Sequence, residues 1–338
     1  MHTLIQKTSG GGRLTALEAE AAMEKILSGA TDEESIFALL SALRARGETA
    51  EELTGFARAM RRHATRIPVA EGRAGEWLVD TCGTGGDGAS TFNISTTAAF
   101  VVAGAGARVA KHGNRSISSK CGSADVLEAL GVSLSLSPQQ TATAIEQIGI
   151  GFLFAPALHT AMRHAMSARR RLGRTAFNLL GPLTNPAGAR AQVVGVYSAD
   201  LVEKMARVLA QLGAERAFVV HGAGGLDEIS LAGQTQIGEV SRGAVHLYEV
   251  RPEDFGLSRA PLSAIAGGDA AHNALLLRAI LAGESGPRRD IVLANAAAAL
   301  VAAGRAADFL EGARLAAQSI DSGTAAAKLD ALIAFTHG

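Results

Sequence analysis

The chain has 338 residues, more than one domain usually holds, so we expect a large domain and a smaller one. Lysine plus arginine and aspartate plus glutamate each total 32, and the resulting zero net charge argues against long-range attraction to nucleic acid or an anionic membrane. Apolar residues make up 48% of the chain and aromatic residues only 4%, a composition that favours helices around a buried aliphatic sheet.

The cysteine and hydropathy patterns indicate where the protein works. Cys82 and Cys121 match neither a paired metal-ligand spacing nor a disulfide framework. The opening residues lack the apolar segment of a signal peptide, and no apolar run has the length needed to span a bilayer. We therefore expect a soluble, cytoplasmic protein without a membrane partner.

The first seventy residues are predicted to be helical. Capping-box patterns open apolar-periodic segments at Thr15 with Glu18, Thr31 with Glu34, and Thr49 with Glu52. Glycines at 29 and 47 are expected to end helices. The pattern changes around Ile67-Pro68, which predicts a domain boundary near residue 70.

Beyond this boundary, short β-like runs alternate with helical ones, which indicates an α/β domain with a mostly parallel sheet. Helices are predicted at residues 137–148 and 199–212, and a hairpin at 234–250 precedes Ala-rich helices. The predicted strands are EWLVDT (76–81), ARVAKHG (107–113), VSLSL (132–136), GFLF (151–154), AQVVGVYS (191–198) and RAFVVHG (216–222).

The glycine-rich stretch DTCGTGGDGASTFNIST, residues 80–96, follows the first of these strands. It satisfies the spacing G-x-G-x-x-G and the outer glycines of a triphosphate loop, but Ala89 and Ser90 replace the Lys and Ser or Thr that such a loop needs. The acid that a dinucleotide site needs about twenty residues later is also missing. The remaining prediction is an anion site at a strand end and a helix N-terminus.

Two further loops contain charged residues that suit such a site. KHGNRSISSKCGS (111–123) begins in the predicted strand 107–113 and places Lys111, Arg115 and Lys120 among small polar residues at its end. VVHGAGGLDEIS (219–230) holds the adjacent acids Asp227 and Glu228. Because ligand loops of α/β sheets gather at strand C-termini, these acids beside a phosphate site predict magnesium, which binds through one or two carboxylates and phosphate oxygens.

Together these stretches resemble the anthranilate phosphoribosyltransferase family. The match runs in the family's order from FALLSALRARGET through the glycine loop, AKHGNRSISSKCGSADVLEALGV, FNLLGPLTNP and VVHGAGGLDEIS to NAAAAL. The resemblance implies a small helical domain (1–72, joined by helices from about 158–182) and a larger α/β domain with a mostly parallel central sheet surrounded by helices (73–157 and 183–338). It also implies a homodimer and magnesium, with two ions beside the donor.

The resemblance assigns roles to residues that match the family's motifs. The phosphoribosyl-donor positions are Gly83, Gly86, Asp87, Thr91, Asn93, Ile94, Ser95, Thr96, Lys111, Ser119 and Ser123. The magnesium positions are Ser95, Asp227 and Glu228, and the anthranilate positions are Gly83, Asn114 and Arg169. No nucleophilic side chain is implied, and His112 is either an orienting residue or a histidine satisfied by local backbone.

The sequence departs from the family pattern near Arg169. The family commonly has a proline where this chain has Ser167, and the segment before RTAFN is one residue short. Arg163 and Arg170 therefore remain candidates beside Arg169 for binding the anthranilate carboxylate.

The activity that the resemblance implies is the second step of tryptophan biosynthesis from chorismate, in which 5-phosphoribosyl 1-pyrophosphate and anthranilate are the substrates. An enzyme of the same fold with another acceptor, or a non-catalytic relative that binds nucleic acid or a phosphorylated regulator, is the alternative.

Overall fold

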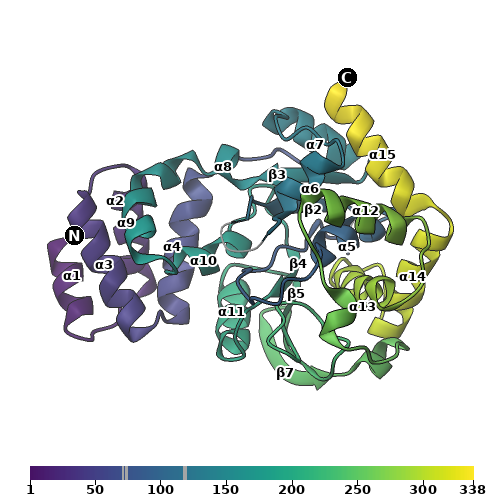
Figure 1. Ribbon diagram of the computed structural model, residues 1–338. Coiled ribbons are helices and arrows are strands. Elements are labelled where there is room, and N and C mark those ends of the chain that lie inside the picture. Colours follow the sequence, from purple (N-terminus) through teal and green to yellow (C-terminus); the bar gives the residue numbers. More distant parts are fainter. Residues whose placement is uncertain (71, 73–74, 117–119) are drawn as a thin grey trace.

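The computed structural model describes residues 1–70, 72, 75–116 and 120–338 and has two lobes (Figure 1). The N-terminal lobe contains helices, and the larger lobe surrounds a seven-stranded sheet. The helices of the N-terminal segment are α1 (His2–Ser9), α2 (Ala16–Leu27), α3 (Glu33–Arg46) and α4 (Ala50–His63). This arrangement confirms the predicted class of a helical unit joined to an α/β unit.

Two of the predicted capping boxes are confirmed. The Thr15 and Thr49 hydroxyls each accept from the amide three residues later at 3.2 Å, and the Glu side chains bond back to the cap amides. The box predicted at Thr31 is wrong, because Asp32 caps α3 and its carboxylate accepts from Ser35 N at 2.9 Å. An aspartate at the cap satisfies the helix start without a glutamate partner.

The chain returns to the helical lobe after the third strand. This returning segment, which we call the connector, contains α8 (Ala155–Leu158), η1 (Thr160–Ala165), α9 (Met166–Leu172), α10 (Phe177–Leu180) and η2 (Gly181–Leu183). Arg171 of α9 pairs with Glu34 of α3 at 2.6 Å, and buried residues of the connector share a core with α2 to α4. The helical lobe is therefore built from two stretches of chain.

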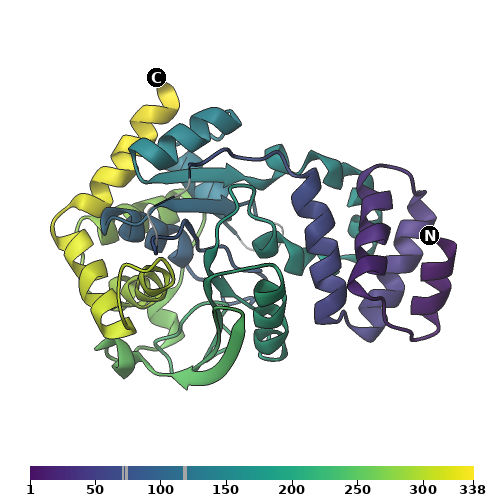
Figure 2. The ribbon, with the colours of Figure 1, turned by 180° about the vertical axis from the view of Figure 1, so that it is seen from behind.

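Helix α4 lies at the junction between the lobes (Figure 2). Its Thr54 hydroxyl donates to Gln211 of α11 at 2.6 Å. Arg61 donates to Leu183 O at 2.7 Å and to Leu212 O at 3.2 Å. The bonds to Gln211 and Leu212 fix the helical lobe against the α/β lobe, and the bond to Leu183 fixes α4 to the connector.

The sheet has the strand order β3-β2-β1-β4-β5-β6-β7, and its first five members are parallel. β6 and β7 are antiparallel, as the predicted hairpin requires. The strands are β1 (Val79–Asp80), β2 (Val109–Gly113), β3 (Ile150–Phe154), β4 (Ala191–Gly195), β5 (Arg216–Gly222), β6 (Thr235–Ser241) and β7 (Ala244–Val250). Because β1 lies between β2 and β4, the strand order reverses at β1.

Helices cover both faces of the sheet. Because alternate residues of a strand point to opposite faces, one strand contributes side chains to two cores. Phe218 and Val220 of β5 join the larger core, whereas Ala217 and Val219 join the core shared with the helical lobe. The first face carries α5 (Ile94–Gly104), α6 (Ser123–Ala129), η3 (Pro252–Phe255), η4 (Leu262–Ile265), α12 (Ala270–Leu281), α13 (Pro287–Ala302), α14 (Phe309–Asp321) and α15 (Thr324–His337). The second carries α7 (Pro138–Gln147) and α11 (Asp200–Gln211). No helix in the described ranges is long and apolar enough to cross a membrane.

One predicted strand is absent. VSLSL (132–136) forms no ladder and instead connects α6 to α7. The Ser133 and Ser135 hydroxyls bond to each other at 2.8 Å, and Ser133 N donates to the Thr336 hydroxyl at 3.1 Å. Serine side chains that bond locally compete with strand pairing, which explains why an alternating pattern failed here.

Candidate active site

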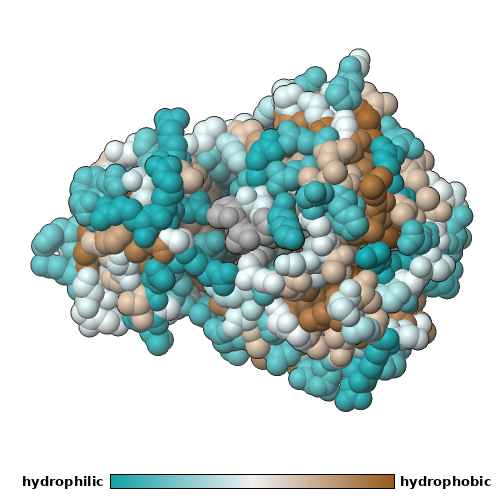
Figure 3. All heavy atoms as spheres, in the orientation of Figure 1, coloured by the Kyte–Doolittle hydropathy of each residue, from teal (hydrophilic) through white to brown (hydrophobic). Residues whose placement is uncertain are grey.

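The glycine loop lies where the strand order reverses. It follows β1 and crosses to the end of β4, where Thr84 N and Thr84 Oγ1 donate to Gly195 O at 2.8 and 3.2 Å. A Cβ on Gly83 would lie 3.1 Å from that same oxygen, so glycine allows the close approach. The space-filling surface is hollowed between the two lobes (Figure 3). Such a reversal point is where open α/β sheets bind ligands.

The second half of the loop requires glycine for its backbone shape. Gly85, Gly86 and Gly88 have φ values of 63°, 84° and 73°, which L side chains rarely adopt. Asp87 lies among them, and its carboxylate accepts from Ala89 N at 3.1 Å and from Asp227 N at 3.4 Å. Through the Asp87 carboxylate, the glycine loop is therefore hydrogen-bonded to the acidic loop that follows β5.

The N-terminus of α5 adjoins this loop. Asn93 is the N-cap residue, but its side chain makes no cap bond; instead it accepts from Asn273 Nδ2 at 3.0 Å and donates to Cys121 O at 3.4 Å. Within α5, Ile94 and Thr96 are buried, and Ser95 N donates to Glu228 Oε1 at 3.1 Å. Helix start, glycine loop and acidic loop thus meet.

Three carboxylates share this position. Burial raises the pKa of Asp227 well above its usual range, and the charges of Asp87 and Glu228 raise it further. Burial likewise raises the pKa of Glu228 to about 7, although the nearby Lys111 ammonium opposes the shift. An excess of negative charge in a half-buried site, with oxygen ligands only, fits a hard divalent cation such as magnesium.

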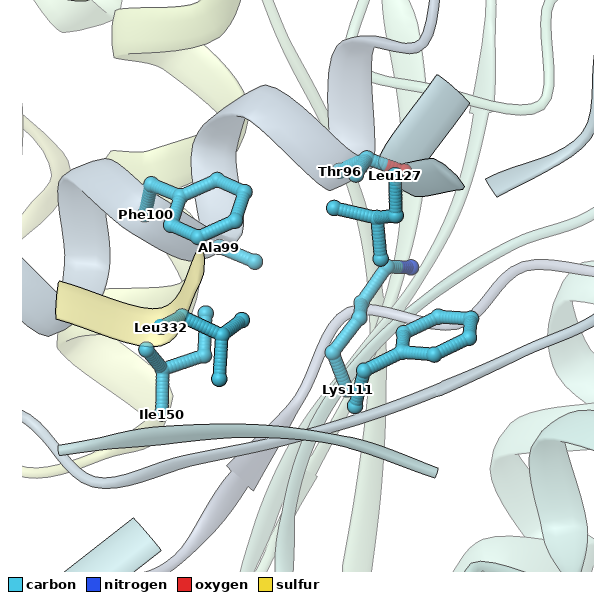
Figure 4. A pocket seen from close by; sticks show the side chains of 8 residues that line it. Thr96, Ala99, Phe100, Lys111, Leu127, Ile150 and Leu332 are labelled. Atoms are coloured by element: carbon cyan, nitrogen blue, oxygen red, sulfur yellow. The ribbon is translucent and has the colours of Figure 1, made fainter. Parts of the chain in front are cut away.

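Lys111 supplies positive charge beside these acids. The residue is 4% exposed, and its stem lies near Leu127 (Figure 4) in an apolar pocket that Phe152 also lines. Nζ donates to Thr81 O at 2.9 Å and lies 3.4 Å from Ser95 Oγ. Lys111 therefore lies inside β2 rather than after it, and its ammonium is held between Thr81 O and Ser95 Oγ beside the acids.

A second polar group lies beneath the loop. The buried Asp80 accepts from His112 N at 3.1 Å and from Asn185 Nδ2 at 2.7 Å, and burial raises its pKa to about 6. With Cys82, the side chains of Asp80 and His112 offer ligand atoms within 4.8 Å of one another. Both Asp80 oxygens already accept hydrogen bonds and the Lys111 charge adjoins them, so this group fixes β1 to β2 and the connector.

His112 and His159 form a neutral pair. His112 Nδ1 donates to Gly181 O at 3.2 Å, and the Nε2 atom of each ring is buried without a partner among the described residues. The ring centroids lie 5.1 Å apart. Burial lowers the pKa of His112 to about 3, with a smaller contribution from His159, and lowers the pKa of His159 to about 4. The partner of His112 Nδ1 is thus a backbone carbonyl of the connector, 69 residues away in the chain, and not the local backbone.

The candidate arginines differ in burial. Arg169 is half-buried, its guanidinium lies 5.1 Å from the Phe177 ring centroid, and burial lowers its pKa. It forms no ion pair with a carboxylate in the described part of the chain, whereas Arg171 pairs with Glu33 and Glu34. Arg163 and Arg170 are exposed. Of the three candidates, Arg169 is thus the partly buried one.

Hydrogen bonds hold the first and the last residues of the loop after β2. Asn114 is exposed, and its side-chain oxygen accepts from Arg115 N at 2.7 Å. Ser123 begins α6, and its hydroxyl donates to Asn114 O at 3.3 Å. Thr91 forms an isolated bridge with Ala266 beside the glycine loop. Ser119 lies outside the described residues.

Sequence reasoning missed Asp80, Asn185 and Arg174. An acid that ends an otherwise apolar strand, as in LVD, is a signal that could have identified Asp80. Arg174 Nη2 donates to Gly86 O at 2.8 Å, and only the spatial approach of the connector to the glycine loop reveals that contact.

A mostly parallel sheet that brings a glycine loop, a buried lysine and paired acids to its reversal point defines an α/β enzyme for a phosphorylated substrate. The glycosyl transferase family's a/b domain matches residues 75–326, and its helical bundle domain matches residues 2–64. The chain belongs to the anthranilate phosphoribosyltransferase family within this group.

Individual relatives support this assignment over the whole length. Anthranilate phosphoribosyltransferase from Symbiobacterium thermophilum is 55% identical over 338 residues, covering 100% of this chain and 98% of that protein. The crystal structure of the Thermus thermophilus enzyme has a TM-score of 0.93 at 46% identity, with 99% of each chain covered. The Saccharomyces cerevisiae enzyme in complex with PRPP and Mg has a TM-score of 0.89 at 30% identity, covering 99% of this chain and 98% of that one.

Proposed function

We propose that this protein transfers the phosphoribosyl group of 5-phosphoribosyl 1-pyrophosphate to the amine of anthranilate and releases pyrophosphate, the second step of tryptophan biosynthesis from chorismate. The observation that carries the proposal is the meeting of the glycine loop, Ser95, Lys111 and Glu228 at the reversal point of the sheet. Membership of the anthranilate phosphoribosyltransferase family supports the choice of both substrates.

The acids fit magnesium, with Ser95, Asp227 and Glu228 as the proposed ligands and two ions as the proposed number. Their raised pKa values result largely from burial and, at Asp227, from the other two carboxylates, and a cation would relieve that repulsion. When bound, magnesium supplies charge neutralisation for the departing pyrophosphate.

The donor contacts are assigned to residues around the glycine loop and α5. Lys111 holds a positive charge where phosphate would lie, and the amides of the left-handed loop and the α5 N-terminus are anion donors. The proposed donor residues are Gly83, Gly86, Asp87, Thr91, Asn93, Ile94, Ser95, Thr96, Lys111, Ser119 and Ser123.

Arg169, with Gly83 and Asn114, is proposed to receive anthranilate. The half-buried Arg169 guanidinium has no acidic partner among the described residues and matches a carboxylate in geometry. An aryl amine needs no prior deprotonation, so positioning and charge stabilisation supply the rate acceleration and no nucleophilic side chain is needed.

We further propose a cytoplasmic homodimer, with a small domain at 1–72 joined by the helices from about 158–182 and a large domain at 73–157 plus 183–338. The two lobes flank one hollow, so closure over the donor would exclude water from a reactive ribosyl cation.

To test this, purified protein is mixed with anthranilate, 5-phosphoribosyl 1-pyrophosphate and magnesium. The loss of anthranilate fluorescence and the release of pyrophosphate are then measured over time. We expect anthranilate to be consumed only in the presence of magnesium, with one pyrophosphate released for each anthranilate consumed. A chelator should abolish both changes. Absence of turnover together with phosphorolysis of a nucleoside would instead favour a same-fold enzyme with another acceptor, and nucleic-acid binding without turnover would favour a non-catalytic relative.

A further inference from the structure

Arg174 connects the part of the chain that carries Arg169 to the glycine loop. It follows α9 in the connector, one residue after Gly173, whose φ of 73° ends that helix. From there its Nη2 atom donates to Gly86 O at 2.8 Å. Its guanidinium carbon lies 4.0 Å from the centroid of the Tyr197 ring, two residues beyond the end of β4. The side chain therefore spans from the connector to the loop over a fixed aromatic platform.

The contact at Gly86 depends on glycine in two ways. Gly86 has a φ of 84°, and a Cβ there would lie 2.4 Å from Arg174 Nη2. Any side chain would therefore strain the backbone and displace the guanidinium. Both the backbone shape of the loop and its contact with Arg174 therefore require glycine at position 86.

The hydrogen bond also fixes the direction of the next amide. A trans peptide points its C=O and its N–H in opposite directions, and the chain contains no cis peptide among the described residues. With Gly86 O held toward the connector, Asp87 N–H points away from it. Arg174 thereby sets the orientation of an amide in the loop proposed to bind phosphate.

The loop is held from its other side by the sheet. Thr84 bonds to Gly195 O at the end of β4, and Asp227 N donates to the Asp87 carboxylate at 3.4 Å. These bonds hold the loop to the sheet and to the acidic loop, whereas Arg174 holds Gly86 from the connector. Arg174 is exposed and forms no ion pair with an acid in the described ranges, so its charge is directed at the loop carbonyl.

We propose that Arg174 is a positioning residue that holds the Gly86–Asp87 peptide in its donor-binding orientation and links the acceptor-binding connector to the donor loop. The inference rests on the proposed function. Its effect should appear in donor affinity, because the loop amides contact the donor, and less in turnover of the fully bound enzyme.

The test measures donor binding directly, by calorimetric titration of the full chain with 5-phosphoribosyl 1-pyrophosphate and magnesium in the absence of anthranilate. We expect Arg174→Gln to raise the donor Kd about tenfold, while kcat at saturating donor changes less than about threefold. Arg174→Lys should recover part of the affinity, since an ammonium can bond to the carbonyl but lacks the planar face that stacks on Tyr197.

Two companion variants separate positioning from general damage. Tyr197→Leu removes the platform and should weaken donor binding in the same direction, whereas Tyr197→Phe keeps the ring but removes the hydroxyl that bonds to Arg174, so it should weaken donor binding less than Tyr197→Leu. Arg171→Gln is the matched control, because it removes a charge from the same segment without touching the loop.

A donor Kd of Arg174→Gln within twofold of the parent would overturn the positioning role. So would a lower thermal unfolding midpoint with an equal fall in kcat and unchanged Kd, the pattern of a structural residue. If the parent protein itself fails to bind the donor, the proposed function fails, and that result is distinct from normal parent binding with an unaffected variant.

Discussion

The amide of Ser95 donates to Oε1 of Glu228 across 3.1 Å, joining the first turn of α5 to the loop after β5. The bond satisfies a helix-start amide with a carboxylate, an arrangement that the helix dipole favours. The charge of Lys111 opposes the upward shift that burial produces in the pKa of Glu228. The same pair thus supports both the fold and the proposed metal site.

Neutralising Asp227 should stabilise the protein while removing its activity. Burial and two neighbouring carboxylates raise the pKa of Asp227, so Asp227→Asn relieves repulsion and should raise the thermal midpoint in the absence of metal. Turnover should fall by about 100-fold or more, because charge on the leaving group is no longer neutralised.

Scanning calorimetry without metal and a magnesium titration of turnover check this prediction. Asp330→Asn, on the surface beside Arg278, is the control and should change neither quantity. Full activity with an unchanged magnesium dependence in Asp227→Asn would remove Asp227 from the metal site.

Gly195 should tolerate no side chain. A Cβ there would lie 1.5 Å from the backbone oxygen of Asp227, which no rotamer change can relieve. We expect Gly195→Ala to lower the free energy of unfolding by at least about 3 kcal/mol. Urea denaturation measures this loss, with Gly181→Ala as the control because its Cβ would meet no atom within 4 Å. Equal stability of the two variants would contradict the close packing of β4 against the acidic loop.

His159 should make the protein sensitive to acid. Burial lowers its pKa to about 4 in the folded state, whereas the pKa of a histidine in the unfolded chain is about 6.5. As the pH falls from about 7 to 5, His159 becomes protonated in the unfolded chain but stays neutral in the folded protein, so the free energy of unfolding falls. His159→Gln should abolish about 2 kcal/mol of that fall.

The measurement is the difference between parent and variant in unfolding free energy at the two pH values. The raised pKa values of Asp80 and Glu228 act in the opposite direction, but both proteins share them and the difference removes them. His246→Gln, at an exposed position, should behave like the parent. An identical pH dependence for His159→Gln would mean that His159 is not held neutral.

Arg169 should determine acceptor affinity. Its half-buried guanidinium lacks an acidic partner among the described residues, so Arg169→Gln should raise the anthranilate KM by about tenfold to 100-fold, the effect of losing a charge-assisted bidentate pair. Donor Kd should change less than about twofold. Steady-state kinetics with each substrate varied in turn tests this, and a comparable effect from Arg170→Gln would transfer the role to Arg170.

The site could be predicted from the sequence where residue types and strand ends coincide. The glycine loop follows β1, Lys111 lies in β2, and the acids at 227 and 228 are in the loop after β5, and parallel pairing brings the ends of these strands to one edge. The contacts of Asp80 with Asn185 and of Arg174 with Gly86 could not be read, because their partners are far apart in the chain and meet only through the connector's path.

Local competition explains the errors in the predicted elements. Thr31 and Asp32 are both good helix caps, and a pattern cannot choose between neighbours of similar preference. VSLSL alternates like a strand, but its serines bond to each other and to α15. The hairpin was readable, because two strand-like runs are separated only by SRG (241–243). The structure pairs Ser241 with Ala244, so the turn is shortened to Arg242 and Gly243, which both have positive φ.

The origin of the helical lobe in two stretches of chain sets an order for its completion on the ribosome. Helices α1 to α4 emerge first, yet η1 and α9, which share their buried core, are made only after the first three strands of the sheet. Until then the nascent bundle has an uncovered apolar face, the kind of surface that chaperones bind. The lobe that emerges first therefore cannot finish folding before part of the second lobe has been synthesised.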